Sequence, residues 1–134
     1  MRTLSDAFEA VKNAAEKHDP LITKYRHTAA IVTKRGQFIS LGRNHFTGNS
    51  IETEEGIFDK TIHAEVNALY KVSVRRLQGA TIISYGRTPT SAILARPCAN
   101  CWAVLKKFGF KKVFYTIYVG GNDAHNPTWK EEYL

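Results

Sequence analysis

The second half of the chain alternates amphipathic helices with short apolar strands, and this order restricts the fold more than any other feature. Residues 62–74 and 98–108 carry apolar side chains at helical spacing, and Gly109 is a stop signal for the second helix. Residues 80–85 and 113–119 are apolar runs of strand length, as expected of central strands. Strands that alternate with helices pair in parallel through right-handed crossovers, so we expect a sheet covered by helices.

The first half predicts one helix and an antiparallel hairpin. Apolar residues recur at helical spacing in residues 4–17. Residues 28–33 and 37–41 have strand character, and Gly36 between them supplies the positive φ of a tight turn. The polar residues 47–60 predict a surface loop that borders a site. The expected fold class is α/β, with three α/β/α layers around a mixed sheet that has an antiparallel N-terminal hairpin and parallel later strands.

The length of 134 residues suits a single domain spanning 1–134, with its core at about 29–118 and a C-terminal tail at 120–134. In the tail, Trp129 and Tyr133 are four residues apart, which predicts a short helix that docks two aromatic rings. No apolar run approaches the roughly 20 residues that span a bilayer, and the N-terminus does not lead into the apolar segment of a signal peptide. We therefore expect a cytoplasmic protein with no membrane partner.

The net charge of +7 favours an anionic partner, which is either a nucleotide phosphate or a nucleic acid backbone. A basic protein without such a partner is the alternative. Four lysines near the end of the helix at 98–108 are equally compatible with a solvated helix end: Lys106, Lys107, Lys111 and Lys112.

The chain contains two cysteines, Cys98 and Cys101, which begin a predicted helix directly after Pro97. At this spacing both thiols lie on one side of the first turn, where the helix dipole lowers their pKa values. The pair alone is open to three interpretations: a thioredoxin-like redox pair, a strained disulfide, or two ligands of a metal ion. Zinc binds well to thiolate and imidazole ligands, and a catalytic zinc site with two cysteines needs one further protein ligand.

His63 is the best candidate for that ligand, because it begins a helix at the sheet edge where Cys98 also lies. Glu65 follows two residues later and can reach the same cavity. Zinc acidifies a bound water, and a neighbouring carboxylate can take the proton and pass it to a ring nitrogen and a leaving amine. The arrangement suits hydrolytic deamination of a nucleobase. The other histidines are assigned structural roles: His18, His27, His45 and His125.

The two motifs His63-Ala64-Glu65 and Pro97-Cys98-Ala99-Asn100-Cys101 together resemble the zinc-dependent cytidine and deoxycytidylate deaminase superfamily, whose signature is H-x-E…P-C-x-x-C. The resemblance covers about residues 29–118 and implies the cytidine-deaminase-like fold. It implies one Zn²⁺ per chain, bound by His63, Cys98 and Cys101, with Glu65 as the catalytic proton shuttle. Asn44 resembles the asparagine that contacts the substrate sugar, and backbone groups of Ala64 and Cys98 are implied to meet the base and the attacking water.

A histidine as the first ligand separates the chain from the small nucleoside deaminases, and residues 94–116 look most like compact deoxycytidylate deaminases of phages and bacteria. The implied reaction converts dCMP to dUMP and releases ammonia. Two alternatives stay open: a deaminase acting on RNA or single-stranded DNA, and a catalytically inactive zinc-containing binding protein. Relatives commonly form homo-oligomers, so a homo-oligomer is also implied. The candidates for phosphate contacts are arginines near the predicted site: Arg43, Arg87 and Arg96.

Overall fold

The computed structural model covers the predicted helices, strands and motif residues, with several gaps in the connections between them. The described residues are 2–16, 26–46, 51–53, 56–58, 61–70, 72–119, 124 and 126–134. Of the histidines that were assigned structural roles, His18 and His125 lie outside these residues, and only the backbone of His45 is described.

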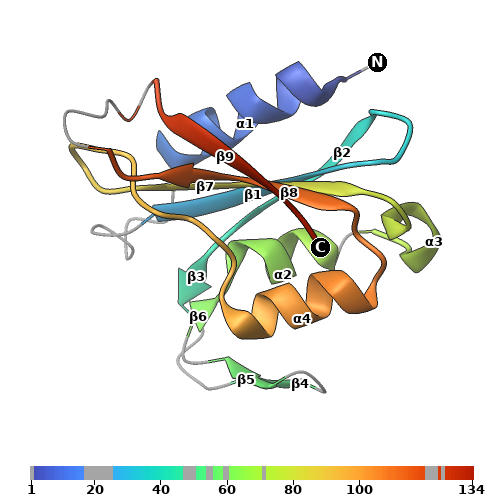
Figure 1. The fold of residues 1–134 in the computed structure, drawn as a ribbon. Coiled ribbons are helices and arrows are strands. Elements are labelled where there is room, and N and C mark those ends of the chain that lie inside the picture. The colour runs from blue at the N-terminus through green and yellow to red at the C-terminus, as the bar shows by residue number, and fades with distance from the viewer. Residues whose placement is uncertain are drawn as a thin grey trace.

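A five-stranded mixed sheet forms the centre of the molecule, in the order β2-β1-β7-β8-β9 (Figure 1). Its strands are β1 (Arg26–Val32), β2 (Phe38–Arg43), β7 (Thr81–Arg87), β8 (Lys112–Ile117) and β9 (Thr128–Tyr133). β1 pairs antiparallel with both β2 and β7, whereas β7 and β8 are parallel. The predicted α/β class, with an antiparallel hairpin followed by parallel strands, is confirmed.

Helices cover both faces of this sheet, with α1 on one face and α2 and α4 on the other (Figure 1). The helices are α1 (Leu4–Glu16), α2 (Ala64–Leu69), α3 (Val74–Leu77) and α4 (Ala99–Lys107). In β1, Ala29 and Ile31 join the core on the α2 side, whereas Ala30 and Val32 join the core under α1. Because successive strand side chains point to opposite faces, a strand that is apolar at every position is buried on both sides.

The prediction of one helix at 62–74 is wrong, because the chain forms α2 and α3 with a turn between them. The Val72 amide donates to the Leu69 carbonyl in this turn, and Ser73 is the N-cap of α3. A β-branched residue followed by serine has low helix propensity, which accounts for the break. Within the described residues, none of the helices has both the length and the apolar character needed to cross a membrane.

The predicted C-terminal helix is also wrong, because β9 is a strand that pairs antiparallel with β8. Successive side chains of β9 point to opposite faces of the sheet, and this alternation explains their contacts better than helical spacing does. Trp129 packs its ring at 4.8 Å from Phe8, in the cluster under α1, whereas Glu132 points to the opposite face and bonds Tyr115. The backbone hydrogen bonds offered by β8 complete the sheet on this side.

The predicted surface loop at 47–60 contains regular structure. β4 (Ile51–Thr53) pairs with β5 (Gly56–Phe58), and β3 (His45–Phe46) pairs with β6 (Thr61–Ile62) just outside it. β-branched and aromatic residues in these short segments favour an extended backbone. The polar composition of the whole stretch hid this strand propensity in the prediction. The predicted loop therefore includes a short antiparallel pair of strands, β4 and β5.

Helix α2 rests directly on the backbone of β2 at Gly42. A Cβ atom at this position would collide with the Ala64 carbonyl and the Ala68 amide of the helix. Ser40, two residues earlier on the same strand face, donates a 2.7 Å hydrogen bond to the Ala68 carbonyl. The absence of a side chain at position 42 thus sets the distance between the sheet and the helix that carries Glu65.

We expect Gly42→Ala to lower the free energy of unfolding by roughly 1–3 kcal/mol, as overpacking of a close contact does. The displaced α2 should also lower the turnover of the zinc-loaded protein. Chemical denaturation and steady-state kinetics measure the two effects. Gly36→Ala is the control, because it has open space and a φ of 87°, so it adds backbone strain far from α2. Equal turnover in the two variants would contradict the prediction.

Candidate active site

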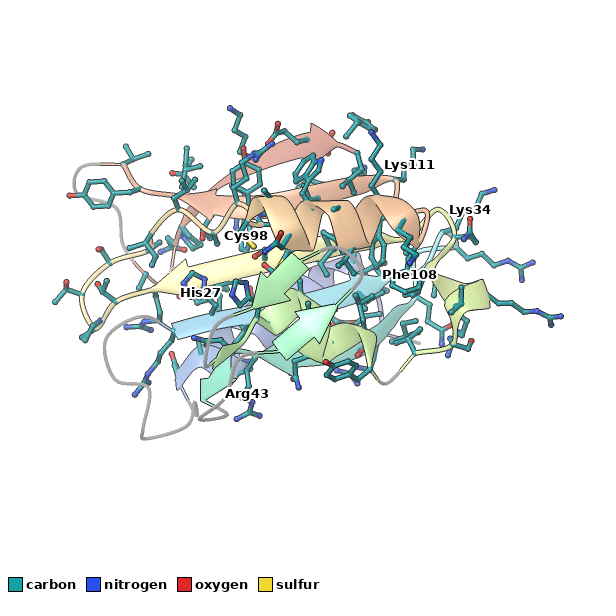
Figure 2. The ribbon with its side chains drawn as sticks, turned by 90° about the horizontal axis from the view of Figure 1, so that it is seen from below. His27, Lys34, Arg43, Cys98, Phe108 and Lys111 are labelled. Atoms are coloured by element: carbon teal, nitrogen blue, oxygen red, sulfur yellow. The ribbon has the colours of Figure 1, made fainter. Side chains whose placement is uncertain are left out.

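Three side chains from two helix starts converge in front of the sheet. His63 is the N-cap of α2, Cys98 is the N-cap of α4, and Cys101 lies in the first turn of α4. The Cys98 sulfur also accepts the Cys101 amide at 3.4 Å, which orients the thiol over the helix N-terminus. Figure 2 shows Cys98 at this end of α4, with His27 on the same side of the molecule. The predicted meeting of the two motifs is therefore present.

The spacing of these three side chains fits a zinc ion. The Nδ1 atom of His63 lies 3.6 Å from Cys98 Sγ and 3.3 Å from Cys101 Sγ, and all three ligand atoms lie within 4.8 Å of one another. Tetrahedral zinc with ordinary Zn–S and Zn–N bonds separates a sulfur from a nitrogen by about 3.5 Å. Cys101 is buried, whereas Cys98 is exposed, so the ligand set is open toward solvent on one side. Three protein ligands with an open side are typical of catalytic zinc sites.

The two thiols share a hydrogen bond and have opposite pKa shifts. The hydrogen bond with Cys101 is the main reason why the pKa of Cys98 falls to about 4, and the His63 ring adds to this effect. The pKa of Cys101 is raised, chiefly by the same hydrogen bond and further by burial and the nearby Glu65 carboxylate. Zinc binds the thiolate form of cysteine, so metal binding releases any proton that the two thiols hold.

Glu65 is buried in the first turn of α2, with 6% of its surface exposed. Its Oε1 atom accepts a 2.7 Å hydrogen bond from the hydroxyl of Ser84, which is fully buried in β7. Glu65 was predicted from its motif, whereas Ser84 was not predicted. A serine among the apolar residues of a central strand was the available signal, because a buried hydroxyl needs a partner.

A cavity of about 370 Å³ lies in front of the ligand set. Its walls contain His27, Asn44, His63, Ala64, Glu65, Ala95, Arg96, Pro97 and Cys98. Asn44 is one of these wall residues, and its Oδ1 accepts the His27 amide at 2.9 Å. The Asn44 amide in turn donates to the His27 carbonyl at 3.0 Å. These paired bonds hold the Asn44 side chain against the end of β1. His27, which was assigned a purely structural role, is thus also a wall of the cavity.

Thr116 in β8 fixes the segment that leads into Pro97. Its hydroxyl accepts the Gly86 amide at 3.0 Å and donates to the Ile93 carbonyl at 2.8 Å. Its carbonyl accepts the Ala95 amide at 2.9 Å. The Thr116 side chain is fully buried, and its hydroxyl both donates and accepts a hydrogen bond. These bonds order the segment that leads to Cys98.

Arg96 is the arginine among the three candidates that lines the cavity. Its Nε donates to Glu132 of β9 at 2.8 Å, and its guanidinium carbon lies 4.2 Å from the centre of the Trp102 ring. The hydrogen bond from Arg96 is also the main reason why the pKa of Glu132 is lowered. Tyr115 donates to the same carboxylate at 2.7 Å. Glu132 was not identified from the sequence, because its role depends on the strand pairing of β9.

The structure does not bring the other two arginines into the cavity. Arg43 lines a separate hollow along the edge strand β2. Arg87 lines another hollow with Arg26, and its guanidinium donates to the carbonyls of Thr88 and Pro89 at 3.1 and 3.2 Å. Both side chains therefore lie apart from the ligand set within the described residues.

Three zinc ligands beside a buried carboxylate define a hydrolytic zinc enzyme, and comparison with known proteins gives the family. The sequence model of the cytidine and deoxycytidylate deaminase zinc-binding region matches residues 1–117. The chain belongs to this family of zinc-dependent deaminases, and its cofactor is one zinc ion at His63, Cys98 and Cys101.

A solved structure gives independent support for the fold. The 1.6 Å crystal structure of cytidine deaminase from Burkholderia pseudomallei is similar to this chain with a TM-score of 0.55 and 21% sequence identity. The alignment covers 96% of this chain and 91% of that one. A search among curated protein sequences finds no match. The family match supports zinc-dependent deamination of cytosine, and the solved structure supports the fold.

Proposed function

We propose that the protein deaminates a free cytosine nucleotide, converting dCMP and water to dUMP and ammonia. The observation that carries the proposal is that Glu65, Asn44 and two of the three ligands, His63 and Cys98, line one cavity of about 370 Å³. This volume is within the usual range for small-ligand sites. In the reaction, a bond forms between C4 of the base and the water oxygen, and the bond between C4 and the exocyclic nitrogen breaks.

Glu65 moves the protons in this proposal. Zinc, when bound, acts as a Lewis acid that lowers the pKa of a coordinated water toward neutrality. The Glu65 carboxylate takes a proton from the attacking water, gives it to the ring nitrogen, and later delivers a proton to the leaving amine. Burial keeps competing bulk water away from the carboxylate, so the proton is exchanged with the substrate.

The remaining walls of the cavity orient the nucleotide. Asn44 is proposed to contact the sugar, and the backbone of Ala64 and Cys98 to contact the base and the water. Arg96 is proposed to meet the phosphate, because it is a cation on the cavity wall and Glu132 and Trp102 already limit its motion. An ordered guanidinium loses little conformational freedom on binding an anion.

A substrate panel tests this proposal. Zinc-loaded protein should release ammonia from dCMP faster than from dCTP, deoxycytidine or cytosine, and metal analysis of the same sample should give one zinc per chain. Arg96→Gln should lower kcat/KM for dCMP by about 10–100-fold, the value of a charged hydrogen bond, and should affect deoxycytidine much less.

Arg43→Gln is the matched control, because it removes the same charge outside the cavity. Absence of turnover on all four compounds with zinc bound would overturn the proposed function. Deamination of deoxycytidine in preference to dCMP would overturn the nucleotide as the substrate, together with the phosphate contact, and would leave cytosine deamination itself standing.

A cluster of positively charged side chains supports the second candidate function, a deaminase of RNA or single-stranded DNA. A hollow of about 450 Å³ is lined by Lys34, Arg35, Arg75 and Arg76, without a carboxylate among the described residues around it. Figure 2 shows Lys34 at the other end of the molecule from Cys98 and His27. These cations do not border the ligand set, so a free nucleotide is the better proposal. Tight binding of an oligonucleotide with a steep salt dependence would reverse this preference.

Two further expectations stay predictions: that the chain forms one deaminase domain, and that it assembles as a homo-oligomer. Trp102 of α4 and the adjacent Phe108 are half-buried and pack against the core of this chain. The mass in solution, measured by light scattering, tests the assembly.

A further inference from the structure

Ser84 is a polar side chain in the centre of the sheet. It lies opposite Ala29 of β1 and opposite Tyr115 of β8, so strands flank it on both sides. Its neighbours Ile83 and Tyr85 point to the core under α1, which directs Ser84 to the face covered by α2. Ser84 has none of its surface exposed, so its hydroxyl has no access to bulk water.

The partner of this hydroxyl is one defined oxygen of Glu65. The Ser84 Oγ to Glu65 Oε1 distance of 2.7 Å is typical of a strong hydrogen bond to a carboxylate. An ionised carboxylate only accepts hydrogen bonds, so the serine is the donor. Glu65 also lines the cavity, and Oε2 is the carboxylate oxygen that Ser84 does not engage.

We propose that Ser84 is a positioning residue, which reserves Oε1 of Glu65 and leaves Oε2 to exchange protons with water and substrate. This inference rests on the proposed deamination. When Glu65 takes up a proton, Oε1 still accepts from Ser84, so the proton resides on Oε2. The same oxygen can then receive a proton from the water and return it to the substrate without rotation of the carboxyl group.

The hydrogen bond also selects one conformation of a flexible side chain. A glutamate has three side-chain torsions, and the loss of its buried donor would allow other conformations of the carboxylate. Misplacement of a catalytic group by about 1 Å can cost on the order of 10²-fold in rate. Loss of an outer partner of a catalytic site typically costs about 10–100-fold.

Three variants test this role. Ser84→Ala should lower kcat per zinc-loaded chain by about 10–100-fold and leave KM within about twofold, because the substrate contacts are unchanged. Ser84→Thr and Ser84→Val have nearly the same shape and differ in the hydroxyl. Any packing cost is common to both, so the threonine variant should exceed the valine variant in kcat by at least about tenfold.

A merely structural serine predicts a different pattern: lower unfolding midpoints and lower zinc content, with kcat per zinc-loaded chain unchanged. That result, or equal kcat in the threonine and valine variants, would overturn the inference. A second measurement uses the unfolding midpoint. The effect of Ser84→Ala should nearly vanish in a Glu65→Ala background, because the contact is already lost. Additive effects would contradict the contact.

The outcomes separate this inference from the proposed function. If the wild-type protein deaminates any compound of the panel and the Ser84 variants match it in kcat, the positioning role alone is wrong. If the zinc-loaded wild type deaminates none of them, the proposed function is wrong, and the positioning role is overturned with it.

Discussion

Glu65→Gln is expected to lower kcat by roughly 10²–10⁴-fold, the usual contribution of a proton-transfer group. Glutamine has the shape of glutamate and can accept the Ser84 hydrogen bond, but it cannot take up a proton at neutral pH. The three zinc ligands stay in place, so zinc content should remain at one per chain. Ammonia release and metal analysis on the same preparation measure the two quantities.

Glu16→Gln is the control for the change of charge, because Glu16 is exposed at the end of α1 on the other face of the sheet. It should leave kcat unchanged. Wild-type turnover in Glu65→Gln would exclude Glu65 as the proton shuttle. A wild-type protein that binds zinc but is inactive, with properties unaffected by Glu65→Gln, would support the catalytically inactive binding protein instead.

Cys101→Ser is expected to lower zinc affinity by more than roughly 100-fold and to abolish measurable turnover. Loss of a residue that only hydrogen-bonds to a metal ligand already costs roughly 10–100-fold. The buried thiolate is one of three protein ligands, and a serine hydroxyl of similar size is a poor zinc ligand. Dialysis against a chelator followed by metal analysis measures the affinity. His63→Ala should have the same effect from the other helix.

Thiol reactivity gives a readout of the same site that does not depend on activity. The chain has two cysteines, so a thiol reagent reports on both ligands and on nothing else. Zinc should protect both thiols in the wild type, and a chelator should remove this protection. A Cys101→Ser protein with stoichiometric zinc and normal turnover would show that the ligand assignment is wrong.

The zinc ligands were predictable because they lie in two short sequence motifs. Cys98 and Cys101 lie three apart at a helix start, and that spacing alone places both thiols on one side of a turn. His63 and Glu65 lie two residues apart at the start of α2, and both line the cavity in front of that helix. The alternation of strands and helices was enough to expect both helix starts at one edge of the sheet.

The errors fall where local propensity competes with packing. Trp129 and Tyr133 fit a helical spacing, but the open edge of β8 offered backbone hydrogen bonds that a helix could not use. The helix expected at 62–74 breaks near Ser73. It was predicted from the apolar periodicity of the stretch, whereas the weak helix propensity around Ser73 ends the helix. Both errors concern element type or length, and neither displaces the motif residues.

By itself, the sequence determined the class of fold, the zinc ligands and the candidate proton carrier, because these depend on periodicity and on residues close together in the chain. The tertiary structure alone decided their partners: Ser84 on Glu65, Asn44 against His27, and Glu132 on Arg96. Each of these contacts joins residues at least 17 positions apart. Contacts at such separation depend on strand register and helix placement, which only the packed core specifies.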